Sequence, residues 1–182
     1  MNTFQIDIPK LKSVVLYIIE RLGEVDFHKA FKIMYFADRE HLAKYGRQIT
    51  GDVYIAMKYG PVPSFTYDVF KAIRGDGYYS KELKTLYGSF EIIGDSVVKG
   101  MGKADMDELS VSDLECLNKA IEENKELTFP QLSKKSHDGA YNAVQRDESL
   151  NLIDIATAGH ANEEMIQYIR ETQENRHISL LQ

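Results

Sequence analysis

Histidine and acidic residues are the side chains of this sequence that could do chemistry, and two of them share a face of one predicted helix. Asp38 and His41 lie three positions apart, so they can meet as an acid–base pair or supply two ligands of a metal ion. His28, thirteen positions before His41, would point to the opposite side of the same helix. A catalytic or metal site would therefore need a third group from elsewhere, such as His137. A hydrogen bond that only supports the fold is the alternative, and we favour it.

The well-known motifs of enzymes and cofactor sites are missing from the sequence. It contains no G-x-S-x-G, H-E-x-x-H or C-x-x-C pattern and no P-loop. A nucleophilic Ser136 beside His137 would also need an orienting acid and an oxyanion site, which the sequence does not indicate. The single cysteine, Cys116, lies within an apolar helix pattern and is expected to be a small buried residue. We therefore predict that the protein is not an enzyme and binds no metal and no cofactor.

Length and composition indicate an ordinary globular protein rather than a fibre, a disulfide scaffold or a membrane protein. The 182 residues are 43% hydrophobic and 27% charged, which suits a single domain over 1–182. The longest apolar run, 14–19, is too short to cross a bilayer, and the first residues do not resemble a signal peptide. A single cysteine fits a reducing compartment, so we expect a cytoplasmic protein that does not bind membranes.

The distribution of charge argues against direct nucleic-acid binding. The net charge is −6, the acidic excess lies after residue 100, and no run of lysines and arginines is present to neutralise phosphates. The acidic half could face a basic protein partner or could simply be a solvated surface. Aromatic residues concentrate instead in the first 90 positions, where they serve the core or a recognition surface.

The segment Tyr59-Gly60-Pro61-Val62-Pro63 places a tyrosine beside two prolines. Proline lacks a backbone donor and fixes φ, so we expect a rigid loop without regular secondary structure. A pre-ordered aromatic loop suits protein recognition, because little entropy is lost when it docks. A tight connector between a strand and a helix is the other interpretation, and the sequence leaves both open.

Helical periodicity accounts for most of the chain. Asp26 is expected to cap the second helix and Gly46 to end it, and Ser64 to cap the third. Capping boxes that begin at Ser112 and Thr128 predict two further helix starts. The expected helices cover 8–22, 27–45, 65–73, a segment from 112 to 121, a short segment after 128, 139–144 and about 162–177.

Strand patterns are few and short. Runs rich in β-branched and aromatic residues occupy 85–87, 90–93 and 96–99, separated by two-residue breaks typical of tight hairpins. Alternation over 53–58 predicts another strand, which is a candidate for the same sheet. The sequence therefore predicts an α+β fold that is predominantly helical, with helices packed around a small antiparallel β-sheet or meander.

Three motifs follow one another along the chain, KIMYFADREH at 32–41, YGRQITGD at 45–52 and YGPVP at 59–63. With these motifs the chain resembles the Panacea domain of SocA-like antitoxins. These motifs are similar to the family patterns K-L-L-Y-x-A-D-x-x-H, Y-G-R-x-I-T-G and Y-G-P-V. The resemblance extends over about 8–155 and includes the segments 109–121 and 132–137, whereas the C-terminal helix over about 162–177 is less typical.

The resemblance implies an antitoxin of a prophage-associated toxin–antitoxin system, which neutralises a cognate protein toxin encoded by an adjacent gene through direct protein–protein interaction. One branch of the family is a proteolytic adaptor that delivers its toxin to the ClpXP protease, and this is the alternative function. A cryptic hydrolase or metal-dependent enzyme built on Asp38, His41 and His137 is a third hypothesis. The candidates for toxin binding are the motif residues Tyr35, Asp38, His41, Gly51, Asp52, Tyr59, Gly60, Pro61, Val62 and His137.

Overall fold

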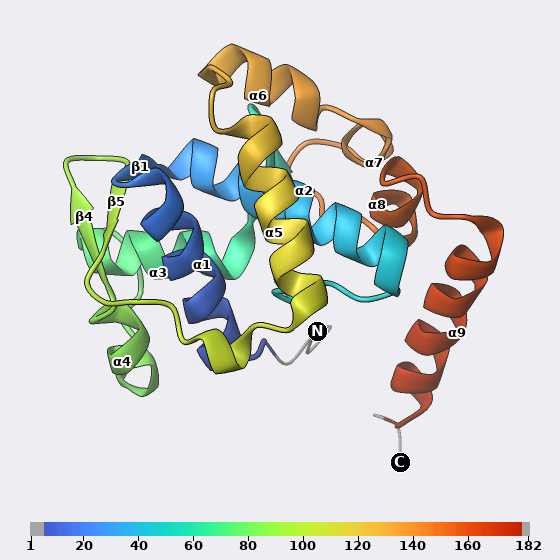
Figure 1. Ribbon diagram of the computed structural model, residues 1–182, viewed down its shortest axis with the longest axis horizontal. Helices are drawn as coiled ribbons and strands as arrows, with labels where there is room; N and C mark the ends of the chain where they lie inside the picture. The colour runs from blue at the N-terminus through green and yellow to red at the C-terminus, as the bar shows by residue number, and fades with distance from the viewer. Residues whose placement is uncertain (1–5, 180–182) are drawn as a thin grey trace.

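The chain folds around one long central helix, α2 (Phe27–Tyr45) (Figure 1). The computed structural model describes residues 6–179, and side chains through residue 175. Five helices from both halves of the sequence pack against α2. They are α1 (Ile8–Leu22), α5 (Val111–Asn124), α6 (Phe129–Ser136), α8 (Leu152–Ala158) and α9 (Glu163–Ser179).

Local signals in the sequence explain where α2 begins and ends. The carboxylate of Asp26 accepts a hydrogen bond from the backbone N–H of His28 at 2.8 Å, which is the expected N-cap. Gly46 ends the helix in the left-handed conformation, with φ at +71°. Every side chain from 30 to 38 is buried, so this helix is enclosed on all sides rather than on one face. The predicted helices over 8–22 and 27–45 are confirmed.

Two small antiparallel sheets complete the α+β, helix-dominated fold, as predicted. The first has the strand order β1-β5-β4 and the second is the hairpin β2–β3. The strands are β1 (Val25–Asp26), β2 (Tyr54–Met57), β3 (Gly60–Pro63), β4 (Phe90–Ile93) and β5 (Val97–Gly100). The strand predicted over 53–58 is observed as β2 and pairs with β3 rather than joining the sheet of β4 and β5, where β1 pairs with β5 instead.

The expectation that Gly60–Pro63 has no regular structure is wrong, because this segment is strand β3. Ala56 of β2 lies opposite Pro61, and its backbone N–H donates to the carbonyl of Glu148, on the side away from β3. In an antiparallel pair, the backbone N–H and C=O groups of two opposite residues either point toward each other or both point away from the partner strand. Pro61, opposite Ala56, therefore faces outward from the hairpin, and so does Pro63, opposite Tyr54, whose carbonyl accepts from Leu150. A missing N–H costs no ladder hydrogen bond at these positions.

The expected strand at 85–87 is also wrong, since these residues belong to the short helix α4 (Lys84–Tyr87). It directly follows the 3₁₀ turn η1 (Lys81–Leu83). The neighbouring side chains of Leu86 and Tyr87 are both buried, whereas a half-buried strand would bury alternate residues. A short apolar run does not distinguish the two structures, and packing of this segment against α3 (Ser64–Arg74) decided between them.

Several helix ends differ from the expected ones. Ser64 makes no side-chain cap for α3, whose cap position is Pro63. The capping box of α5 is formed by Ser110 and Asp113, two residues earlier than the box expected from Ser112. The helix expected over 139–144 ends earlier, as α7 (Gly139–Asn142). The box that begins at Thr128 does open α6 as predicted.

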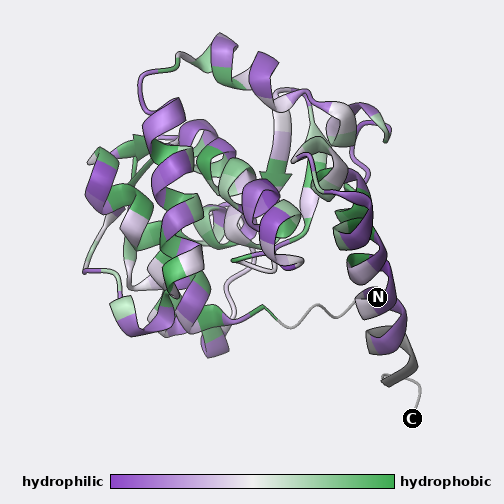
Figure 2. Ribbon diagram, turned by 45° about the vertical axis from the view of Figure 1, so that its right-hand side comes forward, coloured by the Kyte–Doolittle hydropathy of each residue, from purple (hydrophilic) through white to green (hydrophobic). Residues whose placement is uncertain are grey.

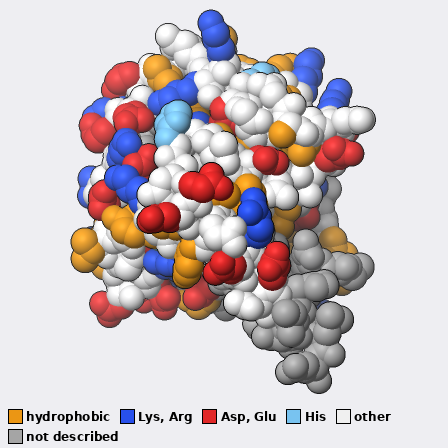
Figure 3. Space-filling view, turned by 90° about the vertical axis from the view of Figure 1, so that its right-hand side faces the viewer, with side chains coloured by type: hydrophobic (Ala, Val, Ile, Leu, Met, Phe, Trp, Pro, Cys, Tyr) orange, Lys and Arg blue, Asp and Glu red, His pale blue; other side chains and the backbone are white. Residues whose placement is uncertain are grey.

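Buried hydrophobic side chains from these elements form one cluster around α1 and α2. Hydrophobic segments, green in Figure 2, gather toward the middle of the molecule, and hydrophilic ones, purple, toward its periphery. On the face seen in Figure 3, acidic and basic side chains are interspersed. Within residues 6–179, no helix has the length and apolar character that crossing a membrane would require.

Candidate functional site

Four polar side chains lie along α2 at every third position, and all of them are buried. Lys32, Tyr35, Asp38 and His41 each expose 1% or less of their surface. Three residues advance a helix by about 300° and about 4.5 Å, so successive side chains rise along the axis and turn by about 60°. Each of the four therefore meets a different part of the chain. We refer to these residues as the polar stripe of α2.

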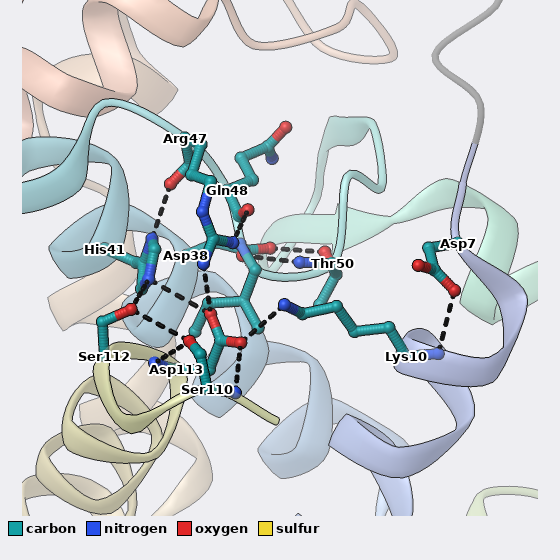
Figure 4. Close-up of polar contacts among 11 residues, drawn as sticks. Asp7, Lys10, Asp38, His41, Arg47, Gln48, Thr50, Ser110, Ser112 and Asp113 are labelled. Carbon is teal, nitrogen blue, oxygen red and sulfur yellow. Dashed lines mark hydrogen bonds and ion pairs between the residues drawn. The ribbon is translucent and has the colours of Figure 1, made fainter. Parts of the chain in front are cut away.

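The Asp38 carboxylate holds the loop between α2 and β2 (Figure 4). It accepts hydrogen bonds from the backbone N–H groups of Ile49 (2.6 Å) and Thr50 (3.1 Å), and from the hydroxyls of Thr50 (2.5 Å) and Tyr54 (2.7 Å). Burial raises the pKa of the Asp38 carboxyl, and these hydrogen bonds oppose the rise. A carboxylate offers about four acceptor positions, so Asp38 has none left for a substrate or a metal ion.

Asp52 positions the next helix in the same way. Its carboxylate accepts hydrogen bonds from the backbone N–H groups of Phe65 and Thr66, each at 2.9 Å, and from the Thr66 hydroxyl at 2.7 Å. A carboxylate at the first turn of a helix satisfies donors that have no partner within the helix, so Asp52 serves as the cap of α3. Gly51, just before it, has φ at +69°, a conformation that glycine adopts at little cost.

His41 connects the end of α2 to the start of α5. Its Nδ1 lies 2.8 Å from the backbone carbonyl of Arg47, which only accepts, so Nδ1 carries the proton. Burial lowers the pKa of His41, and its Nε2 lies 3.0 Å from the Ser112 hydroxyl oxygen. Asp113 Oδ1 lies 3.1 Å from the same Nε2. The imidazole thus fixes the loop after α2 against the first turn of α5.

Asp113 is the charged centre of this region (Figure 4). Its buried carboxylate pairs with Lys10 Nζ at 2.5 Å and Arg47 Nη2 at 3.1 Å, and accepts from the backbone N–H of Ser110 at 2.9 Å. Burial alone would raise the pKa of Asp113, but hydrogen bonds from Lys10 and Ser110 lower it below its ordinary value. The first turn of α1, the loop after α2 and the start of α5 therefore meet at one carboxylate.

Ser112, His41 and Asp113 have the residue types of a catalytic triad but not its arrangement. In a triad the acid binds the Nδ1–H of the histidine and orients the imidazole toward the serine. In this chain a backbone carbonyl binds Nδ1, while the Asp113 carboxylate lies on the Nε2 side and pairs with cations instead. The contacts of these residues hold helices together, which is the structural alternative that the sequence left open for His41.

Tyr35 connects α2 to the turn between α6 and α7. Its hydroxyl lies 2.9 Å from both carboxylate oxygens of Asp138, and Arg39 Nη1 lies 2.7 Å from Asp138 Oδ2. Burial and the adjacent Asp138 carboxylate raise the pKa of Tyr35, so the hydroxyl stays protonated and donates. Asp138 also caps α7 through the backbone N–H groups of Ala140 and Tyr141.

Lys32 connects α2 to the hairpin strand β3. Its Nζ donates a hydrogen bond to the carbonyl of Pro61 at 2.8 Å. This carbonyl faces away from β2, so Lys32 supplies the partner that the strand does not. Burial lowers the pKa of Lys32 to about 7. Gly60 is packed so closely that a Cβ there would overlap the Ser136 hydroxyl oxygen and lie 2.9 Å from Lys32 Cε. With φ at +106°, Gly60 is a position where the backbone also requires glycine.

His137 lies at the C-terminal end of α6, with its ring stacked on Tyr141 at 4.1 Å between centroids. Burial and the positive charge of Lys32 lower the pKa of His137. Within the described part of the chain, its Nε2 is a buried side-chain nitrogen without a hydrogen-bond partner. The Tyr141 hydroxyl donates to the carbonyl of Met57 at 2.9 Å, so this stack borders the turn of the β2–β3 hairpin.

The motif residues predicted as candidates for toxin binding do not form one site. Asp38, His41 and His137 bind different groups, so the arrangement required by the enzyme hypothesis is not present. Among the described residues, no group of three or more histidine, cysteine, aspartate or glutamate side chains could hold a metal ion. The candidates that are buried are Tyr35, Asp38, His41, Asp52, Gly60 and Pro61, those partly buried are Gly51, Val62 and His137, and the exposed one is Tyr59.

Sequence reasoning misses several partners of these residues. Lys32 is identifiable, because it precedes Tyr35 by the same three-residue spacing that separates the rest of the polar stripe. Asp113 and Asp138 are predicted only as residues near helix starts, and no local pattern links them to α2. Phe129, which lies beside Tyr59, is predicted only as the first residue of a capped helix.

Residues 31–141 match the family model described as "Antitoxin SocA-like, Panacea domain". The match covers more than half of the chain and includes the whole polar stripe, together with Asp113, Asp138 and the β2–β3 hairpin. Neither the curated proteins nor the solved structures include a significant match to this chain.

Proposed function

The chain belongs to the SocA-like antitoxin family with its Panacea domain, and we propose that it is an antitoxin that neutralises a cognate protein toxin by direct binding. The family match is the observation that carries this proposal. We propose further that the toxin is encoded by an adjacent gene, that the pair is prophage-associated and that both proteins act in the cytoplasm. The whole of 1–182 is proposed to act as one domain.

The contacts of the polar stripe favour binding over catalysis. Lys32, Tyr35, Asp38 and His41 each hold a separate segment, and the hydrogen bonds to Asp38 and His41 leave them little capacity for a substrate. Enzymes need a nucleophile or base aimed at a site that a substrate can reach, whereas these side chains are buried. We therefore propose that the motif residues build a rigid framework and that the antitoxin is not an enzyme.

The framework leaves Tyr59 as the motif residue best placed to touch a partner. It is 47% exposed at the turn of the β2–β3 hairpin, while Gly60 and Pro61 beneath it are buried. We propose that Tyr59 contacts the toxin and that Gly60, Pro61 and Val62 hold it in position. The other motif residues act on binding indirectly, through the segments that they fix.

A proteolytic adaptor is the alternative form of the same function. In that case the protein would bind its toxin and deliver it to ClpXP, so rescue would depend on the protease. The half-life of the toxin, measured with and without ClpXP in cells that contain the antitoxin, distinguishes the two forms. An unchanged half-life supports neutralisation by binding alone, whereas a half-life that lengthens on loss of the protease supports the adaptor.

Co-expression with each adjacent open reading frame tests the proposal directly. Growth rescue together with a co-purified complex is the expected result. Rescue without a complex would favour an indirect effect or the adaptor. A neighbouring gene product that stops growth and is not neutralised by this chain would contradict the antitoxin role for that pair.

A further inference from the structure

Three rings from separate segments gather on the surface where the hairpin turn meets α6. The Phe129 ring stacks on His28 with 3.8 Å between centroids, and it meets Tyr59 edge-on at 5.1 Å. Phe129 is 45% exposed and Tyr59 47% exposed. Among the aromatic ring pairs of the described residues, this is the pair in which both side chains are at least 45% exposed. We call the surface formed by His28, Lys58, Tyr59 and Phe129 the ring surface.

The backbone under the ring surface is held rigidly. Tyr59 lies in the two-residue turn between Met57 and Gly60, and its carbonyl accepts from His28 Nε2 at 3.3 Å. Burial lowers the pKa of His28 to about 4, so its ring is neutral when it stacks on Phe129. Rings held in this way lose little conformational entropy when a partner covers them, which favours binding.

The Lys58 ammonium and the Tyr59 hydroxyl both offer hydrogen-bond donors on the ring surface. Lys58 Nζ lies 4.9 Å from the centre of the Tyr59 ring, and within residues 6–175 it has no carboxylate partner. The Tyr59 hydroxyl likewise has no hydrogen-bond partner in that part of the chain. Phe129 begins α6, whose cap is the uncharged pair Thr128 and Gln131, so no acidic side chain offsets the positive end of this helix. The complement of such a surface is an anionic group beside an apolar one.

A nucleic acid also carries anions and stacking rings, but the rest of the chain does not favour it. Binding to a phosphate backbone needs several cations along a path, and the ring surface supplies the single exposed cation Lys58. The net charge of −6 adds a long-range repulsion toward polyanions. A short acidic segment of a protein needs only one or two such contacts and is the better match.

We propose that the ring surface is the docking site for the toxin, and that the toxin presents there an aromatic or aliphatic side chain flanked by carboxylates. The apolar side chain covers Phe129 and Tyr59, while a carboxylate pairs with Lys58 and accepts from the Tyr59 hydroxyl. This inference rests on the proposed function, because it names the surface and the chemistry through which that function would act.

A peptide titration tests the surface without knowledge of the toxin. The probe is an end-blocked pentapeptide with a central phenylalanine flanked by glutamates, added to the full-length protein and followed by amide chemical shifts. Saturable shifts centred on residues 28, 58, 59 and 129 are expected, and a lysine-flanked peptide should give none. The absence of saturable shifts at these residues up to about 10 mM, or stronger shifts with an oligouridylate, would overturn the proposal; a millimolar limit suits so small a contact.

Variants of the ring surface then test the complete complex. Phe129→Ala and Tyr59→Ala should each weaken peptide binding, and toxin binding where a toxin is identified, by about tenfold or more. Lys58→Glu should slow association at low salt by about fivefold or more. The matched controls are Tyr78→Ala, which removes a tyrosine that is 89% exposed, and Lys81→Glu in η1; both should leave binding unchanged.

The two proposals fail in different ways. If the wild-type antitoxin rescues growth and the three variants bind the toxin as tightly as the wild type, the docking site is wrong and the antitoxin function stands. If no neighbouring toxin is neutralised but the acidic peptide binds at residues 28, 58, 59 and 129, the ring surface is a docking site and the function assigned to it is wrong.

Discussion

Replacing Lys32 by methionine should stabilise the protein at neutral pH and remove part of its pH dependence. The lysine is 1% exposed and donates one hydrogen bond, to the carbonyl of Pro61 at 2.8 Å. Within the described residues it has no carboxylate partner, so its positive charge is poorly compensated. Methionine has a similar length and no charge, and it would fill the same space between α2 and the hairpin.

The magnitude follows from the change in the lysine pKa, which falls from 10.5 to about 7 on folding. The unfolded chain therefore binds the Lys32 proton more tightly than the folded chain does. At pH 7 this difference lowers the free energy of unfolding by about 4 kcal/mol. Loss of the hydrogen bond to Pro61 costs the methionine variant about 1–3 kcal/mol. The charge effect is the larger one, so Lys32→Met should raise the free energy of unfolding at pH 7 by about 1–3 kcal/mol.

The lowered pKa of Lys32 also fixes the direction in which stability changes with pH. The pKa of Lys32 is lowered on folding, so between about pH 7 and pH 10 the unfolded state holds more protons than the folded state. Stability of the wild type therefore rises with pH in this window, by about 2 kcal/mol from pH 7 to pH 9 through this group. The nearby His28 and His137 have lowered pKa values, and they stay neutral over the same range.

Urea denaturation followed by far-ultraviolet circular dichroism at pH 7 and pH 9 measures both effects. The chain has no tryptophan, which makes circular dichroism the practical probe. For each protein we compare the free energy of unfolding at pH 9 with that at pH 7. The difference in the wild type minus the difference in Lys32→Met isolates Lys32, because the contributions of the other titrating groups largely cancel. Lys81→Met, at an exposed position, is the matched control. If the free energy of unfolding changes equally between pH 7 and pH 9 in the wild type and in Lys32→Met, the inference that the buried Lys32 loses its proton near neutral pH is refuted.

Other substitutions test the remaining contacts of the framework. Asp38→Ala leaves buried donors of the following loop without an acceptor and should lower the free energy of unfolding in urea by about 3–5 kcal/mol, and Asp38→Asn by less. Gly60→Ala forces a Cβ against the Ser136 hydroxyl and should lower the melting temperature, whereas Gly102→Ala, in open space, should not; equal effects of the two would contradict the close packing of Gly60. The lowered pKa of Asp113 means that it stabilises the fold above its ordinary pKa and that this contribution is lost as pH falls through the lowered value. Asp113→Asn should therefore flatten the fall in stability on acidification, and a curve of wild-type steepness would show that another carboxylate is responsible.

Local patterns in the sequence determined most helices of this protein. Asp26 and Gly46 bracket α2, and Thr128 with Gln131 opens α6, because a cap depends on residues within one helical turn of each other. The apolar spacing over 8–22 likewise predicted α1 within its observed bounds. The helix-dominated α+β class followed from these elements, and the motifs at 32–41, 45–52 and 59–63 indicated the family before any contact was known.

Tertiary structure alone decided how the motif residues are used. Pro61 lies in a strand because its missing N–H faces away from β2, and this orientation depends on the hairpin register rather than on proline itself. Tyr35 meets Asp138 across a separation of 103 residues, and Lys32 is buried only because β3 and α6 cover it. Dihedral preferences and caps act over a few residues, whereas burial and pairing depend on segments that come together only when the chain packs. The elements of this protein could therefore be predicted one at a time, but the framework that they build and the ring surface that it displays could not.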